Sequence, residues 1–124
     1  MLTWYAAPAA AQAFGGAERT VRCWDPRASS TVATTALTSH AAWVAAVRWC
    51  PWHEHQLLSA SHDGALKVWD MRAAVPLHTV SPESGKLLAA DWWRARAGEG
   101  AAGRRVACGG EGARVHIYAA KPQI

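Results

Sequence analysis

The stretches Thr20–Arg27 (TVRCWDPR) and Ala65–Arg72 (ALKVWDMR) share one pattern, a short strand-like run that ends in Trp-Asp-x-Arg. Their tryptophans, Trp24 and Trp69, lie 45 residues apart. Similarity at a fixed period of about 20–50 residues indicates a repeat architecture. The sequence therefore predicts a structural unit that recurs along the chain.

The length of this period indicates the kind of repeat. A period of about 40–45 residues is typical of WD repeats, each of which forms one four-stranded propeller blade. A closed propeller takes roughly 4–8 blades, which is more than 124 residues can supply. We therefore predict an all-β fold, an incomplete WD-repeat β-propeller of about two and a half four-stranded blades. We expect the chain to be a piece of a longer protein, or to complete its array by association.

The repeat pattern divides the chain into unequal units. The sequence predicts a partial blade at 1–36, a complete WD repeat at 37–80, a degenerate last repeat at 81–119 and a tail at 120–124. In the complete repeat, Asp63-Gly64 is the strongest hairpin signal, because this dipeptide suits a tight turn between two apolar runs. The strands of that repeat are predicted at 43–49, 56–61, 65–69 and 75–80.

Four residues of the complete repeat form a predicted hydrogen-bond tetrad, namely His40, Ser59, Asp63 and Trp69. In WD repeats the tryptophan indole donates to the serine, the serine contacts the histidine, and the histidine pairs with the turn aspartate. Such groups need partners when they are buried, so we expect a structural role. Ser61 stays open as an alternative to Ser59, because residues two apart on a strand share a face.

A serine, a histidine and an aspartate together also suggest a hydrolase. However, no Gly-x-Ser-x-Gly elbow surrounds Ser59, and the partner Trp69 explains the group without a nucleophile. We therefore predict no catalytic residues and no enzyme activity. The other units lack the full tetrad and are expected to rely on packing; Glu18 stands at the aspartate position of the first, and Glu83 and Gly112 stand at the histidine and aspartate positions of the last.

Composition argues against several other classes. His53-Glu54-His55 supplies too few ligands for a metal site, and we expect no cofactor and no small-molecule substrate. No apolar run approaches the about 18 residues that span a bilayer. The odd set of cysteines without a Cys-x-x-Cys pair favours a reducing compartment. The net charge of +4 without a long Lys/Arg run is compatible with RNA, and we expect any such contact to be indirect.

The candidates for protein binding are Arg27, Arg72, Trp43 and Trp93. Substrate receptors of cullin-type ubiquitin ligases carry the Trp-Asp-x-Arg box, and its arginine contacts the ligase adaptor. Alternatively, these arginines form local ion pairs worth about 1 kcal/mol or less. Adjacent strand residues point to opposite faces, so Trp92 and Trp93 cannot both lie in one core layer. One of them is a candidate anchor for a partner.

The order of the motifs resembles a known family over about residues 14–118. The stretches that carry the resemblance are Glu18–Arg27, Ser39–Val44, Val47–Pro51, Ser61–Asp70, Pro76–Val80 and Gly85–Trp92, followed by Gly109-Gly110 and Tyr118. They resemble the C-terminal end of the WD-repeat ribosome-biogenesis family that joins Pescadillo and the block-of-proliferation protein in one complex. The resemblance implies a non-catalytic scaffold of the nucleus and nucleolus that acts in maturation of the large (60S) ribosomal subunit and its rRNA. The implied partners are proteins of a Pescadillo-type complex and of the pre-ribosomal particle.

Two alternative functions remain open. The paired Trp-Asp-x-Arg boxes fit a substrate receptor of a cullin-type ubiquitin ligase. The Val-Arg-Trp-x-Pro rhythm of Val47–Pro51 is shared with the WD-repeat receptor for peroxisomal import signals.

Overall fold

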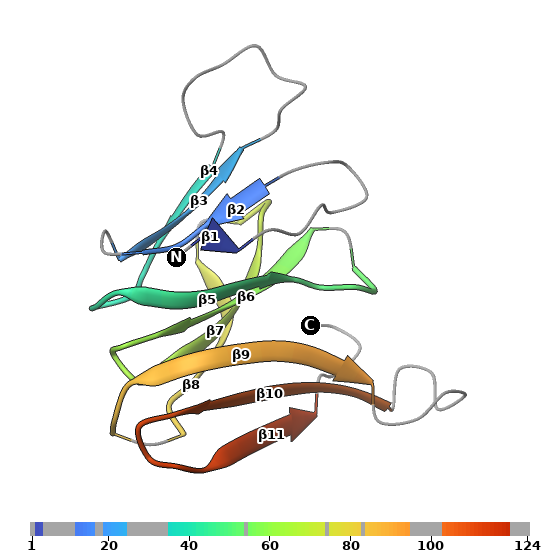
Figure 1. The fold of residues 1–124 in the computed structure, drawn as a ribbon. Helices are drawn as coiled ribbons and strands as arrows, with labels where there is room; N and C mark the ends of the chain where they lie inside the picture. Colours follow the sequence, from blue (N-terminus) through green and yellow to red (C-terminus); the bar gives the residue numbers. More distant parts are fainter. Residues whose placement is uncertain are drawn as a thin grey trace.

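The computed structural model contains three antiparallel sheets built from eleven strands in its described residues. Figure 1 shows them stacked in chain order, with the middle sheet between the other two. The prediction of an all-β fold is confirmed, and the described segments include no helix long and apolar enough to cross a membrane. The structure describes residues 2–3, 12–16, 19–24, 35–53, 55–73, 75–82, 84–94 and 103–119.

The sequence indicates three strands in the first unit, at 9–14, 20–24 and 31–37, and the first sheet of the structure has one strand more. Its order is β1 (Leu2–Thr3), β2 (Gln12–Phe14), β3 (Thr20–Trp24) and β4 (Thr35–Thr38). The added strand β1 pairs antiparallel with β2. Two residues are too few to show the alternation of period two that reveals a strand, so this strand left no signal in the sequence.

The middle sheet follows the predicted pattern closely. It consists of β5 (Val44–Trp49), β6 (Gln56–Ser61), β7 (Leu66–Asp70) and β8 (Pro76–Val80), each paired with the next. Three of these strands begin one residue later than predicted, and β6 has the predicted bounds. The order of strands is that of one propeller blade.

The third sheet has one strand fewer than the other two in the described residues. It has three strands, β9 (Leu87–Arg94), β10 (Arg104–Gly110) and β11 (Val115–Ala119). The pairing of β9 with β10 shifts register at Gly109/Gly110, where a Cβ on Gly110 would collide with the backbone of Lys86. Large apolar side chains of this sheet remain exposed, namely Leu88, Trp93, Val115 and Ile117.

Two apolar cores lie on opposite faces of the middle sheet, and consequently every residue of β6 and β7 is buried. The core shared with the first sheet contains Ala13, Val21, Cys23, Leu37, Val44, Val47, Trp49, Leu57 and Trp69. The core shared with the third sheet contains Ala46, Cys50, Leu58, Ala60, Leu66, Val68, Leu87, Ala90, Trp92, Val106 and Cys108. The buried thiols Cys23, Cys50 and Cys108 form no disulfide, and burial raises the pKa of Cys23 to about 12.

In all three sheets a residue with positive φ precedes the third strand. This residue is Arg19, Gly64 or Ala113, with φ of 65°, 82° and 56° respectively. The N–H of each donates to the C=O three residues earlier, at 3.4, 3.1 and 3.2 Å. A three-residue hairpin loop of this kind needs a left-handed residue at its end. Only the middle sheet places a glycine there, so the other two turns carry backbone strain.

We expect Ala113→Gly to raise the free energy of unfolding by up to about 1 kcal/mol. A left-handed non-glycine residue costs roughly 1–2 kcal/mol, which exceeds the roughly 0.5–1 kcal/mol of added chain entropy that glycine brings. Gly64→Ala should lower stability by about 1 kcal/mol for the same reason. Urea unfolding measures both changes. The control is Gly112→Ala, since Gly112 is not among the residues with positive φ, and a large loss in this control would contradict the argument.

Candidate functional site

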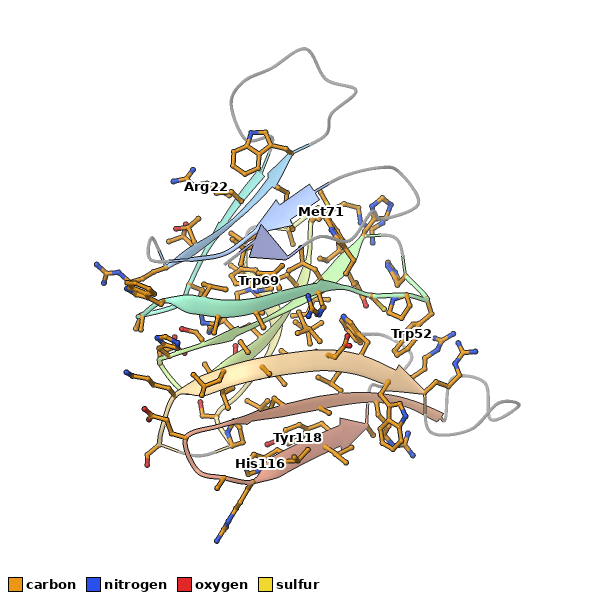
Figure 2. All side chains as sticks on the ribbon, in the orientation of Figure 1. Arg22, Trp52, Trp69, Met71, His116 and Tyr118 are labelled. Atoms are coloured by element: carbon orange, nitrogen blue, oxygen red, sulfur yellow. The ribbon has the colours of Figure 1, made fainter. Side chains whose placement is uncertain are left out.

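The predicted tetrad is assembled from four neighbouring elements. His40 lies in the connection between β4 and β5, and Ser59 lies in β6. Asp63 lies in the turn from β6 to β7, and Trp69 lies in β7. Figure 2 labels Trp69 between the first and middle sheets, where its indole belongs to the shared core. The structure therefore brings all four side chains together at a sheet-to-sheet interface.

The four side chains form one continuous chain of hydrogen bonds. The Trp69 indole Nε1–H donates to Ser59 Oγ at 2.8 Å. Ser59 Oγ lies 2.6 Å from His40 Nε2, and His40 Nδ1 lies 3.1 Å from Asp63 Oδ2. A carboxylate only accepts, so Nδ1 carries the proton, and Nε2 then accepts the hydroxyl proton of Ser59. In this arrangement, the Trp69 N–H, the Ser59 hydroxyl and the His40 Nδ1–H each have an acceptor.

The alternative residue, Ser61, has a different set of partners. Its hydroxyl donates to the C=O groups of Ala42 and Trp43, at 3.2 and 2.8 Å, and accepts the N–H of Asp63 at 3.2 Å. Although Ser59 and Ser61 are both fully buried, only Ser59 contacts the Trp69 indole. Ser61 instead ties the β6–β7 turn to the connection that precedes β5.

The carboxylate of Asp63 is held by backbone groups as well as by His40. It accepts the N–H of Ala41 at 2.9 Å and the N–H of Ala65 at 2.8 Å. Burial alone would raise the pKa of Asp63, but these bonds and the His40 contact outweigh it and lower the pKa below its ordinary value. Burial lowers the pKa of His40, against the opposing effect of Asp63. The neutral imidazole and the ionised carboxylate are therefore the favoured forms.

The order serine, histidine, carboxylate also occurs in hydrolases, but here the geometry does not suit catalysis. Ser59 is 0% exposed, and the His40 side chain is equally inaccessible. A nucleophile must reach a substrate, and a general base must reach the proton that it removes. The Trp69 indole also occupies an acceptor position on Ser59. The arrangement suits a structural role, in which it satisfies polar groups between two packed sheets.

The candidates for protein binding lie in different places. Trp43 is 57% exposed and stacks on His62, with ring centroids 6.1 Å apart and planes at 8°. Trp93 is 47% exposed on β9, whereas its neighbour Trp92 is buried and donates to the C=O of Arg48 at 3.0 Å. Arg27 lies outside the described residues.

Arg72 forms a local ion pair within its own box. Its Nε and Nη2 atoms donate to the two oxygens of Asp70 at 2.9 and 2.6 Å, and its backbone N–H donates to the same carboxylate at 2.9 Å. The hydrogen bond from Arg72 lowers the pKa of Asp70 to about 2. Because the Arg72 side chain is 62% exposed, solvent screens much of this interaction.

The predicted tetrad positions of the other units are only partly visible. Glu18 and Glu83 lie outside the described residues, and so does Glu54 of the His53-Glu54-His55 stretch. In the third sheet, Cys108 and Tyr118 stand where the middle sheet has Ser59 and Trp69, and the Cys108 thiol is buried in the core. Among the residues described, no group of three His, Cys, Asp or Glu could hold a metal ion.

One cluster of side chains has no motif in the sequence. The guanidinium groups of Arg94 and Arg104 lie over the indole of Trp52. The sequence indicates an Ala/Gly/Arg loop from Trp93 to Arg105, whereas the structure places Arg94 in β9 and Arg104 in β10. The contact with Trp52, in another unit of the chain, follows only from the packing of the two sheets.

Comparison with known proteins bears on the repeat that contains the tetrad. The model of the family described as "WD domain, G-beta repeat" matches residues 30–70. This range contains β5, β6 and β7 and all four tetrad residues. The chain therefore contains a WD40 repeat at residues 30–70. The match covers three of the four strands of the middle sheet and ends before β8 (Pro76–Val80).

This WD40-repeat chain is also homologous, over part of its length, to proteins of ribosome biogenesis. It is 44% identical over 91 residues to the ribosome biogenesis protein WDR12 homolog of Chlamydomonas reinhardtii, covering 71% of this chain and 20% of that protein. The corresponding Arabidopsis thaliana protein is 42% identical over 86 residues, covering 66% and 19%. The ribosome biogenesis protein YTM1 of Meyerozyma guilliermondii is 38% identical over 82 residues, covering 64% and 18%. The matched region thus spans about a fifth of the length of these relatives.

We expect Asp63→Ala to lower the free energy of unfolding by roughly 1–3 kcal/mol, because it leaves the buried Nδ1–H of His40 without an acceptor. Urea unfolding measures the loss. The matched control is Asp91→Ala, whose side chain is 71% exposed and lies 4.0 Å from Arg48; this change should cost no more than about 0.5 kcal/mol. Equal stability of Asp63→Ala and the parent would contradict a structural tetrad.

We also expect stability to fall as the pH drops below the ordinary pKa of histidine. The folded protein holds His40 at a lowered pKa, so below about pH 6.5 the unfolded chain binds more protons than the folded one. The contribution of His40 is therefore complete above that pH and is lost on acidification. Unfolding free energies between about pH 7.5 and 5.5 test this. His40→Asn should start less stable and show a shallower slope, while an equally steep slope in both proteins would exclude His40 as its source.

Proposed function

We propose that the chain acts as a non-catalytic WD-repeat scaffold in maturation of the large (60S) ribosomal subunit and its rRNA. The observation that carries this proposal is the similarity to WDR12 homologs and YTM1, whose names assign them to ribosome biogenesis. The proposed setting is a pre-ribosomal particle in the nucleus and nucleolus. The proposed partners are proteins of a Pescadillo-type complex, as the resemblance of the motifs implies.

The buried tetrad supports a scaffold rather than an enzyme. The only Ser-His-Asp arrangement in the described residues lies inside a sheet-to-sheet interface, with Ser59 0% exposed and bonded to Trp69. A buried network in which the polar groups hydrogen-bond one another gives rigidity to the blade. Rigid blades present fixed surfaces to partners, which is the usual property of repeat arrays.

The exposed aromatic pair Trp43–His62 is the proposed protein contact of the middle sheet. The two rings are nearly parallel at 8°, and Ser61 fixes Trp43 through a hydrogen bond from its hydroxyl to the Trp43 C=O at 2.8 Å. An exposed tryptophan on a backbone that is already ordered loses little entropy when a partner covers it. Tryptophan is also enriched among the residues that dominate binding energy. Trp93, on the third sheet, is the second candidate by the same argument.

Purification of the tagged protein from cells, followed by sedimentation, tests the proposed function. Co-sedimentation with precursors of the large subunit, together with proteins of that particle, is the expected result. Recovery with a cullin ligase adaptor alone would favour the substrate-receptor function, in which Arg72 would have to leave its pair with Asp70. Recovery only with peroxisomal import cargo would favour the other alternative. Either of these two outcomes would overturn the biogenesis proposal.

We expect Trp43→Ala to reduce recovery of the protein partner with little change in folding. Truncation of a dominant interface residue costs about 2 kcal/mol or more, which corresponds to roughly a thirty-fold loss of affinity. The matched control is Leu77→Ala, since Leu77 is also exposed, at 39%, but lies on the outer strand β8. Equal losses from both variants would mean that Trp43 is no specific contact.

A further inference from the structure

Two arginines and a tryptophan form a compact cluster at one end of the third sheet. The guanidinium carbon of Arg94 lies 5.8 Å from the centre of the Trp52 ring, and that of Arg104 lies 5.3 Å from it. Trp52 comes from the β5–β6 connection, and its indole meets Trp92 edge-on at 5.4 Å and 83°. Figure 2 labels Trp52 beside the ends of β9 and β10. The cluster therefore bridges the middle and third sheets.

The two positive charges of the cluster are brought together by the fold itself. Arg94 on β9 and Arg104 on β10 stand directly opposite each other in the antiparallel register. Like charges in this position repel each other and destabilise a sheet. The indole of Trp52 attracts both guanidinium groups through its ring face, but it carries no charge that could neutralise them.

Within the described part of the chain, neither arginine of the cluster has a carboxylate partner. Arg48 and Arg72, in contrast, each lie within 4.0 Å of one. The Nε atom of Arg104 is buried, and no hydrogen-bond acceptor for it occurs among these residues. A buried donor without an acceptor is costly unless another group supplies one. The cluster thus combines an uncompensated pair of charges with an unused donor.

We propose that Arg94 and Arg104 bind phosphate groups of a single-stranded RNA segment. The planar guanidinium group matches the geometry of phosphate oxygens. Stacking on Trp52 holds both groups in place before the ligand arrives, which lowers the entropy cost of binding. Proteins that bind single-stranded nucleic acid combine basic and aromatic side chains in this way. Binding would neutralise the cross-strand charge pair, so the ligand would remove a strain that the free chain carries.

The choice of RNA rests on the proposed function, because RNA phosphate is the most concentrated anion inside a pre-ribosomal particle. An acidic protein segment would offer carboxylates to the same arginines and is the competing outcome. The proposal departs from the sequence-based expectation that any contact with RNA would be indirect. It assigns the direct contact to Arg94 and Arg104, at the paired ends of β9 and β10.

Ultraviolet crosslinking of the tagged protein in cells, followed by purification and RNA labelling, is the first test. The double variant Arg94→Gln/Arg104→Gln should lose most of the crosslinked RNA and still co-sediment with the particle. Arg94→Gln alone gives a partial loss and leaves the fold intact, because Arg94 is exposed. The matched control, Arg114→Gln, removes an exposed arginine from the opposite end of the same sheet and should keep its crosslinks. Unchanged crosslinking in the double variant would overturn the proposal.

Binding of the purified protein to a fluorescent oligouridylate at several salt concentrations is the second test. Each phosphate contact contributes about 0.7 to the slope of log affinity against log salt concentration for single strands. The double variant should therefore have a slope shallower by about 1.4, so that its loss of affinity between about 50 and 200 mM salt is about seven-fold smaller. An equal slope in the parent and the double variant would exclude Arg94 and Arg104 as the binding site. Equally strong competition by polyglutamate would identify an acidic protein segment, and not RNA, as the ligand.

The two tests separate this proposal from the proposed function. A parent protein that co-sediments with the particle but neither crosslinks to RNA nor binds oligouridylate would sink the RNA site and leave the scaffold function standing. A parent protein that binds oligouridylate through Arg94 and Arg104 without joining the particle would support the RNA site and overturn the scaffold function.

Discussion

Burial of both faces of the inner strands β6 and β7 is the constraint on which the rest of the structure depends. Strands β6 and β7 are buried along their whole length, so their polar side chains cannot use water as a partner. In the tetrad, the hydroxyl of Ser59 accepts the Trp69 indole N–H and donates to His40 Nε2, so that it needs no water. The same burial keeps the group from acting on a substrate. Burial of the strands thus explains both why these polar residues are paired with one another and why they are unsuited to catalysis.

The tetrad also positions the neighbouring sheet. His40 lies in the connection between β4 and β5. Its hydrogen bonds to Ser59 and Asp63 therefore fix the position of the segment that joins the first sheet to the middle sheet. A backbone bond from Val44 N–H to the C=O of Gly16, at 2.9 Å, joins the same two sheets nearby. The third sheet lacks a full tetrad in its sequence, and its contacts with the middle sheet are the apolar core and the packing of Trp52 against Arg94 and Arg104. The two interfaces of one sheet are therefore held by different physical means.

Much of the middle sheet could be predicted because its signals are local. The Asp63-Gly64 turn follows from turn chemistry, and the spacing of the tetrad follows from the repeat period. The choice between Ser59 and Ser61 could not be made, because both lie on one face of the strand. The pairing of Arg94 and Arg104 with Trp52 depends on how two sheets pack, which leaves no periodic trace in a sequence. The left-handed Ala113 breaks the local rule that favours glycine.

The uneven burial of the three sheets has a consequence for local opening of the protein. Amide hydrogens exchange through fluctuations whose free energy rises with the buried contacts that must be broken. Strand β6 lies between two cores and between two paired strands, so its amides should be the slowest to exchange. Strand β11 has one paired neighbour, and its alternate side chains, Val115 and Ile117, are 74% and 54% exposed. Within the third sheet, exchange should therefore proceed from β11 towards β10, and the edge that opens carries the apolar side chains Val115 and Ile117.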